Sequence, residues 1–157
     1  MGYIVEVRSL IGNYPLILVR PSVVIINKMG EILLVKYSDG FWGIPGGLME
    51  LGESVEVSAR REVKEEVDID VGKLHLFGVF SGKELYTKLR NGHEYYSVII
   101  CYICTDFMGD IKPDGQEVLE AKFYNLAEVP EKTQPFIKEK LKELGPELGK
   151  LLKTTIH

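Results

Sequence analysis

The residues best suited to chemistry are three glutamates, Glu62, Glu65 and Glu66, spaced at i, i+3 and i+4 so that they share one arc of a helix. Like charges at this spacing repel each other by roughly 0.2–0.5 kcal/mol per exposed pair. A hard divalent cation gives them a reason to converge, because Mg²⁺ prefers oxygen ligands and keeps coordination sites open for water and phosphate. The alternative is an ordinary solvated helix face, which three glutamates alone do not exclude.

The segment 46–69, GGLMELGESVEVSARREVKEEVDI, must position these carboxylates. It begins as a glycine turn after Pro45, gains helix formers near residues 53–54 and is expected to continue as a helix to about residue 67. An apolar stripe runs along one helix face and consists of Val55, Ala59, Val63 and Val67. The three glutamates lie beside that stripe, at the edge of a face that we expect to be buried.

Glycine, glutamate and arginine extend the pattern around the three carboxylates. Gly47 is followed after five residues by Glu53, and after seven more by the stretch Arg61-Glu62-Val63-Lys64-Glu65-Glu66. The whole resembles the signature of the Nudix hydrolases (MutT-like), GX5EX7REUXEEXGU, in which U is an aliphatic residue. Every fixed position matches except the last glycine, which is Asp68 here and is followed by the expected aliphatic Ile69.

Asp68 follows the helix at a position that is often left-handed and usually glycine. Aspartate tolerates the left-handed region better than most residues do. We therefore expect a stability cost of about 1 kcal/mol and an intact carboxylate cluster. The aspartate in place of the last glycine of the signature is therefore expected to affect the shape of the loop after the helix.

The resemblance implies hydrolysis of a nucleoside diphosphate linked to another group X, by attack of water on phosphorus. It implies Mg²⁺ or Mn²⁺ bridging the diphosphate and a support role for Glu53 and Arg61, which would pair and brace the loop. The general base is a glutamate of the signature or of a distant loop, where Glu117 and Glu120 are equally interpretable as surface carboxylates. The predicted catalytic residues are Glu53, Arg61, Glu65 and Glu117, and the predicted metal ligands are Gly46 through its carbonyl, Glu62, Glu65 and Glu66.

Two aromatic residues are candidates for substrate contacts. Trp42 either packs under the glycine turn or stacks on a nucleobase. Tyr86 lies seventeen residues after Ile69, near the place where dinucleoside polyphosphate hydrolases of the family carry a tyrosine, whereas the proline of ADP-ribose members is missing around Leu85. Dinucleoside polyphosphates, oxidised nucleotides, ADP-ribose and nucleotide sugars all stay open as substrates. A non-catalytic nucleotide-sensing module is the alternative function, disfavoured because every carboxylate of the signature is present.

Apolar runs separated by turn residues predict a strand-rich chain around the central helix. Before the central helix, the expected elements are a helix or edge strand over 2–11, an apolar run over 16–19 ended by Pro21, and a hairpin joining 23–26 to 32–36. After it, we expect a strand over 74–80, a hairpin joining 84–89 to 94–105 across Asn91-Gly92, and a polar loop over 106–116. The chain is then expected to form a strand over 121–124, a short turn over 126–130 and a helix over 135–144 broken by Gly145-Pro146. This order predicts an α/β protein, and the resemblance implies a Nudix-type α/β/α sandwich with a mixed β-sheet.

Cys101 and Cys104 form a C-x-x-C that we interpret as part of a strand. They lie in a run rich in β-branched and aromatic residues. Residues three apart in a strand point to opposite faces, so neither a disulfide nor a shared metal is expected.

Length and charge bound the remaining possibilities. The 157 residues are expected to form a single domain over 1–157, and a net charge of −4 without a basic run argues against nonspecific nucleic-acid binding. No apolar run is long enough to span a membrane and no signal-peptide core is visible, so we expect a soluble cytoplasmic protein. A homodimer is a further expectation, motivated by the N-terminal apolar residues Ile4, Val5, Val7 and Leu10.

Overall fold

The structure, a computed structural model, describes residues 2–155. The helices are α1 (Tyr3–Ile11), α2 (Val55–Val67) and α3 (Pro135–Thr155), with short 3-10 turns η1 (Lys83–Leu85) and η2 (Leu126–Glu128). The strands are β1 (Leu16–Ile25), β2 (Ile32–Tyr37), β3 (Trp42–Gly43), β4 (Asp70–Val71), β5 (His75–Phe80), β6 (Tyr86–Lys88), β7 (Glu94–Cys104), β8 (Phe107–Met108) and β9 (Val118–Tyr124). Among the described helices, none is long and apolar enough to cross a membrane.

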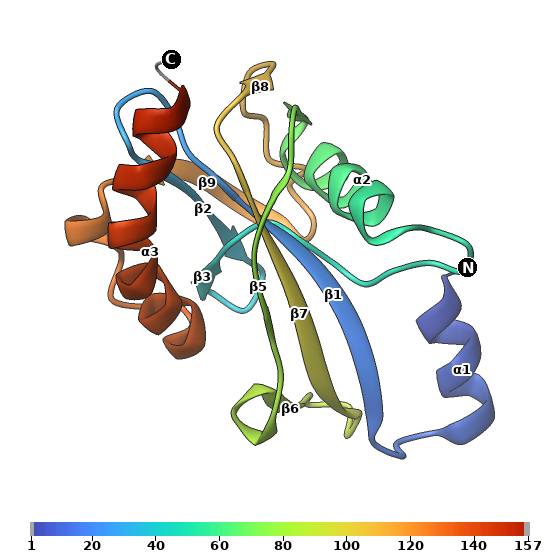
Figure 1. Ribbon diagram of the computed structural model, residues 1–157. Coiled ribbons are helices and arrows are strands. Elements are labelled where there is room, and N and C mark those ends of the chain that lie inside the picture. Colours follow the sequence, from blue (N-terminus) through green and yellow to red (C-terminus); the bar gives the residue numbers. More distant parts are fainter. Residues whose placement is uncertain (1, 156–157) are drawn as a thin grey trace.

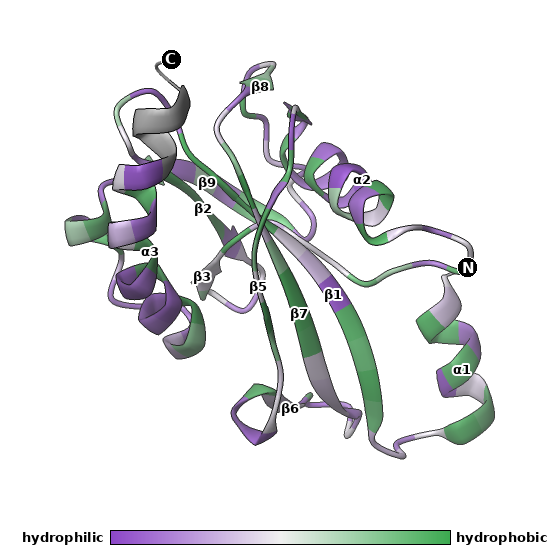
Figure 2. Cartoon of the chain, viewed as in Figure 1, coloured by the Kyte–Doolittle hydropathy of each residue, from purple (hydrophilic) through white to green (hydrophobic). Residues whose placement is uncertain are grey.

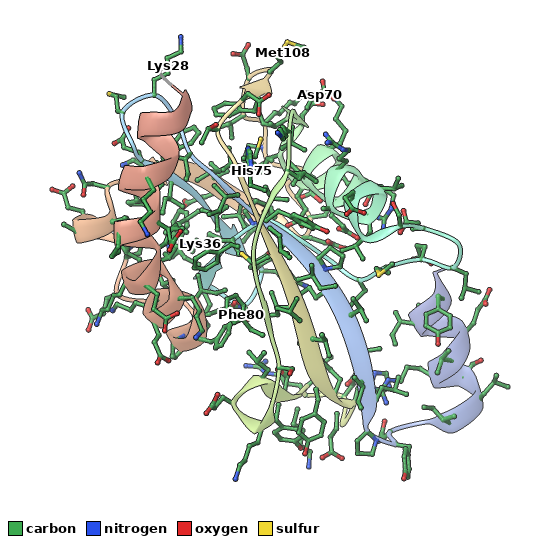
Figure 3. The ribbon with its side chains drawn as sticks, viewed as in Figure 1. Lys28, Lys36, Asp70, His75, Phe80 and Met108 are labelled. Atoms are coloured by element: carbon green, nitrogen blue, oxygen red, sulfur yellow. The ribbon has the colours of Figure 1, made fainter. Side chains whose placement is uncertain are left out.

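Parallel and antiparallel pairings occur together, as predicted for a mixed sheet. Strands β1 and β7 pair in parallel, and β5 and β6 both pair with β7 in the antiparallel sense. A second sheet has the order β3-β2-β9, and the short strands β4 and β8 pair where Asp70 lies opposite Met108, at one end of the molecule (Figure 3). Helices α2 and α3 lie on opposite sides of these strands (Figure 1). The predicted α/β/α sandwich is confirmed.

Strand alternation divides the core into two apolar clusters, one toward each helix. On β1, Val24 packs in the cluster that contains α3 residues, whereas Val23 and Ile25 pack in the cluster that contains α2 residues. Cys101 and Cys104 are both free and buried, one in each cluster, which confirms that they are strand-interior residues on opposite faces. Figure 2 shows the hydrophobic colouring of β1 and β7 between the two helices.

The first predicted hairpin is wrong. Ile26 and Ile32 form only an isolated bridge, and β1 and β2 belong to different sheets. Both runs are buried on both faces, a pattern that suits any central strand and cannot specify its partner. The turn between them therefore connects two sheets rather than two paired strands.

Pro21 does not end a strand, contrary to expectation. Strand β1 runs through it, with Pro21 opposite Ile100 in the register with β7. The carbonyl of Pro21 accepts from the N–H of Gly47 at 3.2 Å, so the main-chain groups of this residue face the glycine turn and not β7. The missing proline N–H thus removes no ladder bond to β7.

Helix α3 also continues through a predicted break. Pro146 lies inside it, and the helix extends to Thr155. A proline leaves the carbonyl four residues earlier without its helical partner, here that of Lys142, a residue exposed to solvent. Leu144 and Leu148 are buried on either side of Pro146 and hold the helix against the core.

The other expected elements are found with small differences. The hairpin at Asn91-Gly92 is confirmed by the pairing of β6 with β7. Residues 3–11 form a helix rather than an edge strand, and the polar loop over 106–116 contains the short strand β8. Helix α1 has no buried residue, and Leu10 is 85% exposed. The homodimer through this segment stays a prediction.

Asp68 adopts the left-handed conformation expected for its position, with φ 60° and ψ 32°, and its N–H caps the helix by donating to the Lys64 carbonyl. Its carboxylate also forms an exposed ion pair with Lys64 at 3.1 Å. An alanine in this conformation costs about 1 kcal/mol relative to glycine.

We therefore expect Asp68→Ala to be less stable than Asp68→Gly by about 1 kcal/mol in urea unfolding. Both variants lose the ion pair with Lys64, so the difference between them isolates the backbone strain. Equal stabilities of the two variants would show that the left-handed conformation is not maintained in solution.

Candidate active site

The glycine turn after Pro45 lies in close contact with β1. The N–H of Val23 donates to the Pro45 carbonyl at 3.0 Å, and the N–H of Gly47 donates to the Pro21 carbonyl at 3.2 Å. Through these two bonds, the main chain of the turn pairs with the edge of β1. On its other side the turn contacts the C-terminal half of α2, where the N–H of Gly46 donates to Glu66 at 3.0 Å.

Neither glycine in this turn has room for a side chain. A Cβ on Gly46 would lie 2.5 Å from the Pro21 carbonyl oxygen and 2.4 Å from the Ser22 hydroxyl. A Cβ on Gly47 would lie 2.2 Å from the Glu62 carboxyl carbon. Two glycines are therefore required by close approach, the first to the backbone of β1 and the second to a carboxylate of α2.

Helix α2 begins at a conventional cap and buries two of the three glutamates. The Ser54 hydroxyl accepts from the N–H of Val57 at 3.1 Å. The predicted apolar stripe packs in the core, and the two glutamates beside it are buried as well. Glu62 is 9% exposed and Glu66 is 1% exposed. Glu65 stays on the solvent side. The three carboxylates therefore occupy different environments.

Arg61 links the helix to the loop before it, as the resemblance implies. Its guanidinium donates to both oxygens of Glu53, at 2.6 and 2.9 Å, and to the Leu48 carbonyl at 3.1 Å. The hydrogen bonds from Arg61 lower the pKa of Glu53 to about 2. The structure brings the two residues together as predicted, and their role in catalysis stays a prediction.

Arg61 also holds two of the predicted metal ligands. Its Nη1 lies 2.9 Å from a Glu62 oxygen and 3.2 Å from a Glu65 oxygen. Within the described residues, no three carboxylate, histidine or cysteine side chains are gathered as a ready metal site. Glu65 would have to turn from Arg61 to join Glu62 and Glu66 around one ion.

Glu66 is the most perturbed carboxylate of the site. Burial raises its pKa to about 8, although Arg20 and the N–H of Gly46 favour the charged form. Its Oε1 accepts from the N–H of Gly46 at 3.0 Å, and its buried Oε2 has no hydrogen-bond partner in the described part of the chain. A buried oxygen without a partner, beside Glu62 and the glycine turn, fits a hard divalent cation.

Two residues that the sequence did not single out, Arg20 and Tyr37, complete the buried side of the site. Arg20 Nη2 donates to the Tyr37 hydroxyl at 3.0 Å and to the Gly46 carbonyl at 3.1 Å, and Tyr37 donates to the Ile44 carbonyl at 2.9 Å. The available signal was an arginine inside an apolar run, because a charge in a buried strand requires partners.

A cleft of about 810 Å³ opens over this site. It is lined by residues of β1, the glycine turn, β6, β7 and the start of α3, and the predicted residues on its wall are Gly46, Glu62, Tyr86 and Glu117. Tyr86 is 40% exposed and bonds to Glu94 while its ring contacts that of Tyr96. The cleft thus brings together residues that are more than seventy positions apart, as Gly46 and Glu117 are.

The other predicted residues are not among those that line the cleft: Glu53, Arg61, Glu65 and Glu66 belong to α2 and the loop before it, and Trp42 and Glu120 lie elsewhere. Trp42 is 9% exposed and packs edge-on against Tyr124, with ring centroids 5.4 Å apart, and it is not one of the residues lining the cleft. This position matches the packing alternative rather than stacking on a base. Glu120 is exposed on β9, opposite Lys36, and also lies outside the cleft wall.

The two glycines give a matched test of this geometry. Gly46→Ala would press a methyl group against main chain, which cannot move cheaply, so we expect a loss of stability of about 1–3 kcal/mol. Gly47→Ala would press against the end of the Glu62 side chain, so we expect a smaller loss of stability and weaker Mn²⁺ binding. Thermal unfolding and electron paramagnetic resonance of Mn²⁺ measure the two effects. Equal loss of stability in both variants would contradict the conclusion that Gly46 approaches main chain and Gly47 approaches the end of a side chain.

The pKa of Glu66 predicts a pH-dependent stability in EDTA. The fold favours the neutral form, so this stabilisation is complete below the ordinary pKa of about 4.5 and is lost as pH rises toward 8. Glu66→Gln stays neutral, so we expect the melting temperature of the wild type to fall relative to the variant between pH 5 and about 8. Parallel curves for the two proteins would contradict a buried, protonated Glu66.

Sequence comparisons identify relatives of this chain. It matches the family model described as NUDIX domain over residues 18–144. It is 34% identical to ADP-ribose pyrophosphatase of Methanocaldococcus jannaschii over 68% of this chain and 61% of that protein. It is 29% identical to NAD-capped RNA hydrolase NudC of Vibrio vulnificus over 80% of this chain and 44% of that protein. The chain therefore spans only about half the length of these curated relatives.

Solved structures share the fold. The crystal structure of a MutT NUDIX hydrolase from Burkholderia pseudomallei is 23% identical, with a TM-score of 0.68 over 82% of this chain and 98% of that one. The NUDIX domain of Shewanella oneidensis NrtR, complexed with ADP ribose, is 22% identical, with a TM-score of 0.66 over 83% of this chain and 86% of that one. With the family model matched from the core of β1 to Leu144 in α3, this chain belongs to the NUDIX domain family.

Proposed function

We propose that this protein is a metal-dependent hydrolase that cleaves the diphosphate linkage of a nucleoside diphosphate joined to another group X. The observation that carries the proposal is the buried pair Glu62 and Glu66, one with an oxygen that lacks any partner among the described residues, set against a glycine turn at the floor of a large cleft. Family membership supports the same chemistry.

The ligands of the ion would be the carbonyl of Gly46 and the carboxylates of Glu62, Glu65 and Glu66. When bound, Mg²⁺ or Mn²⁺ would neutralise charge on phosphoryl oxygens and lower the pKa of a bound water. Glu66 is anchored to the turn through the N–H of Gly46, so the distance between helix and turn is set before an ion arrives. This rigidity favours a site of defined size.

The other residues have supporting and proton-transfer roles in this proposal. Arg61 and Glu53 restrain the loop before α2 through their two hydrogen bonds. The attacking water gives its proton to Glu65, which is exposed, or to Glu117, which lines the cleft. The bond that breaks is a phosphoanhydride P–O bond: the water oxygen adds to the attacked phosphorus, the bridging oxygen leaves with the other phosphate, and the products are a nucleoside monophosphate and the phosphate of X.

The relatives narrow the substrates to test first. The names of two relatives, ADP-ribose pyrophosphatase and NAD-capped RNA hydrolase NudC, mention substrates that contain an adenosine diphosphate unit. ADP-ribose and NADH are therefore the first substrates to test. Dinucleoside polyphosphates also stay among the substrates to test, because Tyr86 lines the cleft. A nucleotide sensor stays the second candidate, and the presence of every signature carboxylate argues against it.

We expect hydrolysis of at least one such substrate with Mg²⁺ or Mn²⁺ and none in EDTA. Replacing both Glu65 and Glu66 by glutamine should reduce kcat/KM by roughly a thousandfold, because several kcal/mol of charge stabilisation would be lost. Product release by chromatography measures the rate, with ADP-ribose, NADH, diadenosine polyphosphates, nucleotide sugars and oxidised dGTP compared.

Glu120→Gln is the matched control, since it removes an exposed carboxylate outside the cleft wall. Activity that survives the double substitution would refute the metal mechanism. Tight nucleotide binding without cleavage of any substrate would favour the sensor.

A further inference from the structure

Arg20 is the only lysine or arginine among the residues that line the cleft. The cleft is otherwise acidic, and its carboxylate residues are Asp39, Glu50, Glu62, Glu84 and Glu117. A diphosphate entering it meets one fixed positive charge, whatever the nucleoside and whatever the group X. The position of that charge therefore decides where phosphoryl oxygens are held by protein rather than by an ion.

The five N–H donors of Arg20 are unequally used. Its Nη2 donates to the Tyr37 hydroxyl and the Gly46 carbonyl, which occupies both protons of that nitrogen. Its Nε and Nη1 have no hydrogen-bond partner among the described residues. Neither nitrogen is one of the fully buried polar atoms that lack a partner, which are Ser58 Oγ and Glu66 Oε2. The unused donors of Arg20 therefore keep some accessible surface, and Arg20 is one of the residues that line the cleft.

The guanidinium is also held in place before any ligand binds. Arg20 lies in β1, where it is opposite Ile99 in the parallel register with β7. Tyr37, which accepts from Arg20, is itself fixed by donating to the Ile44 carbonyl at 2.9 Å. A planar guanidinium suits two oxygens of a phosphate, and holding it beforehand reduces the entropy lost when a ligand binds.

We infer that Arg20 contacts the substrate diphosphate directly, through its unused Nε and Nη1 donors beside the Gly46 carbonyl. The inference rests on the proposed function and adds to it a substrate-contacting residue on β1, outside the glycine turn and helix α2. Arg20 is the protein's own cation for the diphosphate, and it contacts the turn at the Gly46 carbonyl, whereas Arg61 contacts the Leu48 carbonyl.

A purely structural role is the competing explanation. Arg20 would then serve only to hold the Gly46 carbonyl and to offset the charges of Glu62 and Glu66. The two explanations differ in what Arg20→Met does to metal and to diphosphate. A substrate contact affects the diphosphate alone, whereas a structural support affects both, because Gly46 and Glu66 are predicted to hold the ion.

The experiment measures Mn²⁺ affinity by electron paramagnetic resonance and the affinity for imidodiphosphate, a diphosphate that resists hydrolysis, by calorimetry with Mn²⁺ present. The variants are Arg20→Met, Arg20→Lys and the control Lys28→Met. Lys28 lies in the exposed turn between β1 and β2 (Figure 3), and it is not among the residues that line the cleft. Imidodiphosphate carries neither base nor X, so the result does not depend on knowing the substrate.

We expect Arg20→Met to bind Mn²⁺ at least as tightly as the wild type, because a positive charge near the carboxylates is removed. Its affinity for imidodiphosphate should fall by roughly 10- to 100-fold, as for a lost charge-assisted hydrogen bond. The imidodiphosphate affinity of Arg20→Lys should lie between those of the wild type and Arg20→Met, because lysine keeps the charge but lacks the paired donors of a guanidinium. The affinity of Lys28→Met should match that of the wild type. On a hydrolysed substrate, Arg20→Met should show a raised KM.

Weaker Mn²⁺ binding in both Arg20→Met and Arg20→Lys would overturn the inference in favour of structural support. Unchanged imidodiphosphate affinity in Arg20→Met would overturn it as well. In either case the wild type still binds the metal and the diphosphate, and the proposed function stands. Failure of the wild type to bind imidodiphosphate with Mn²⁺ would instead overturn the proposed function, and the role of Arg20 with it.

Discussion

The close contact between the glycine turn and its two neighbours, β1 and helix α2, is the constraint on which the site depends. A single methyl group on Gly46 or Gly47 would not fit. The main-chain bonds to β1 set the turn on one side, and the bond from the Gly46 N–H to Glu66 sets it on the other. Because the turn is fixed from both sides, the Gly46 carbonyl, Glu62 and the Arg20 guanidinium line one cleft and Glu66 is buried against the same turn, without any long flexible link.

Much of this half of the site could be predicted because its information is local. Helix α2, its apolar stripe and the left-handed Asp68 all follow from residue spacing within one segment. The pairing of Glu53 with Arg61 also spans only eight residues. Spacing also accounts for the exposed Glu65, because at about 100° per residue it lies farther from the apolar stripe than the buried Glu62 and Glu66 do.

The errors share a different cause, namely partners distant in sequence. Pro21 does not interrupt β1, because the one N–H it lacks would have faced the glycine turn, which is more than twenty residues away in sequence. The isolated bridge at Ile32 replaces a hairpin, because β1 prefers β7 and β2 prefers β9. Arg20 was overlooked for the same reason: its partners, Tyr37 and Gly46, are assembled only by the fold. Sheet pairing is decided by burial across the whole chain, and local patterns do not contain it.

Two arginines offset the negative charges of the carboxylates in this site. Arg61 contacts Glu62 and Glu65, and the charge of Arg20 acts on Glu62 and Glu66, so both arginines offset the repulsion among the glutamates. The offset is incomplete, because burial still raises the pKa of Glu66 to about 8 and leaves it largely protonated at neutral pH. A divalent ion favours the charged carboxylate, so uptake of the ion and release of the Glu66 proton are coupled. In the proposed metal site, the burial that holds Glu66 in place would therefore make metal affinity rise with pH.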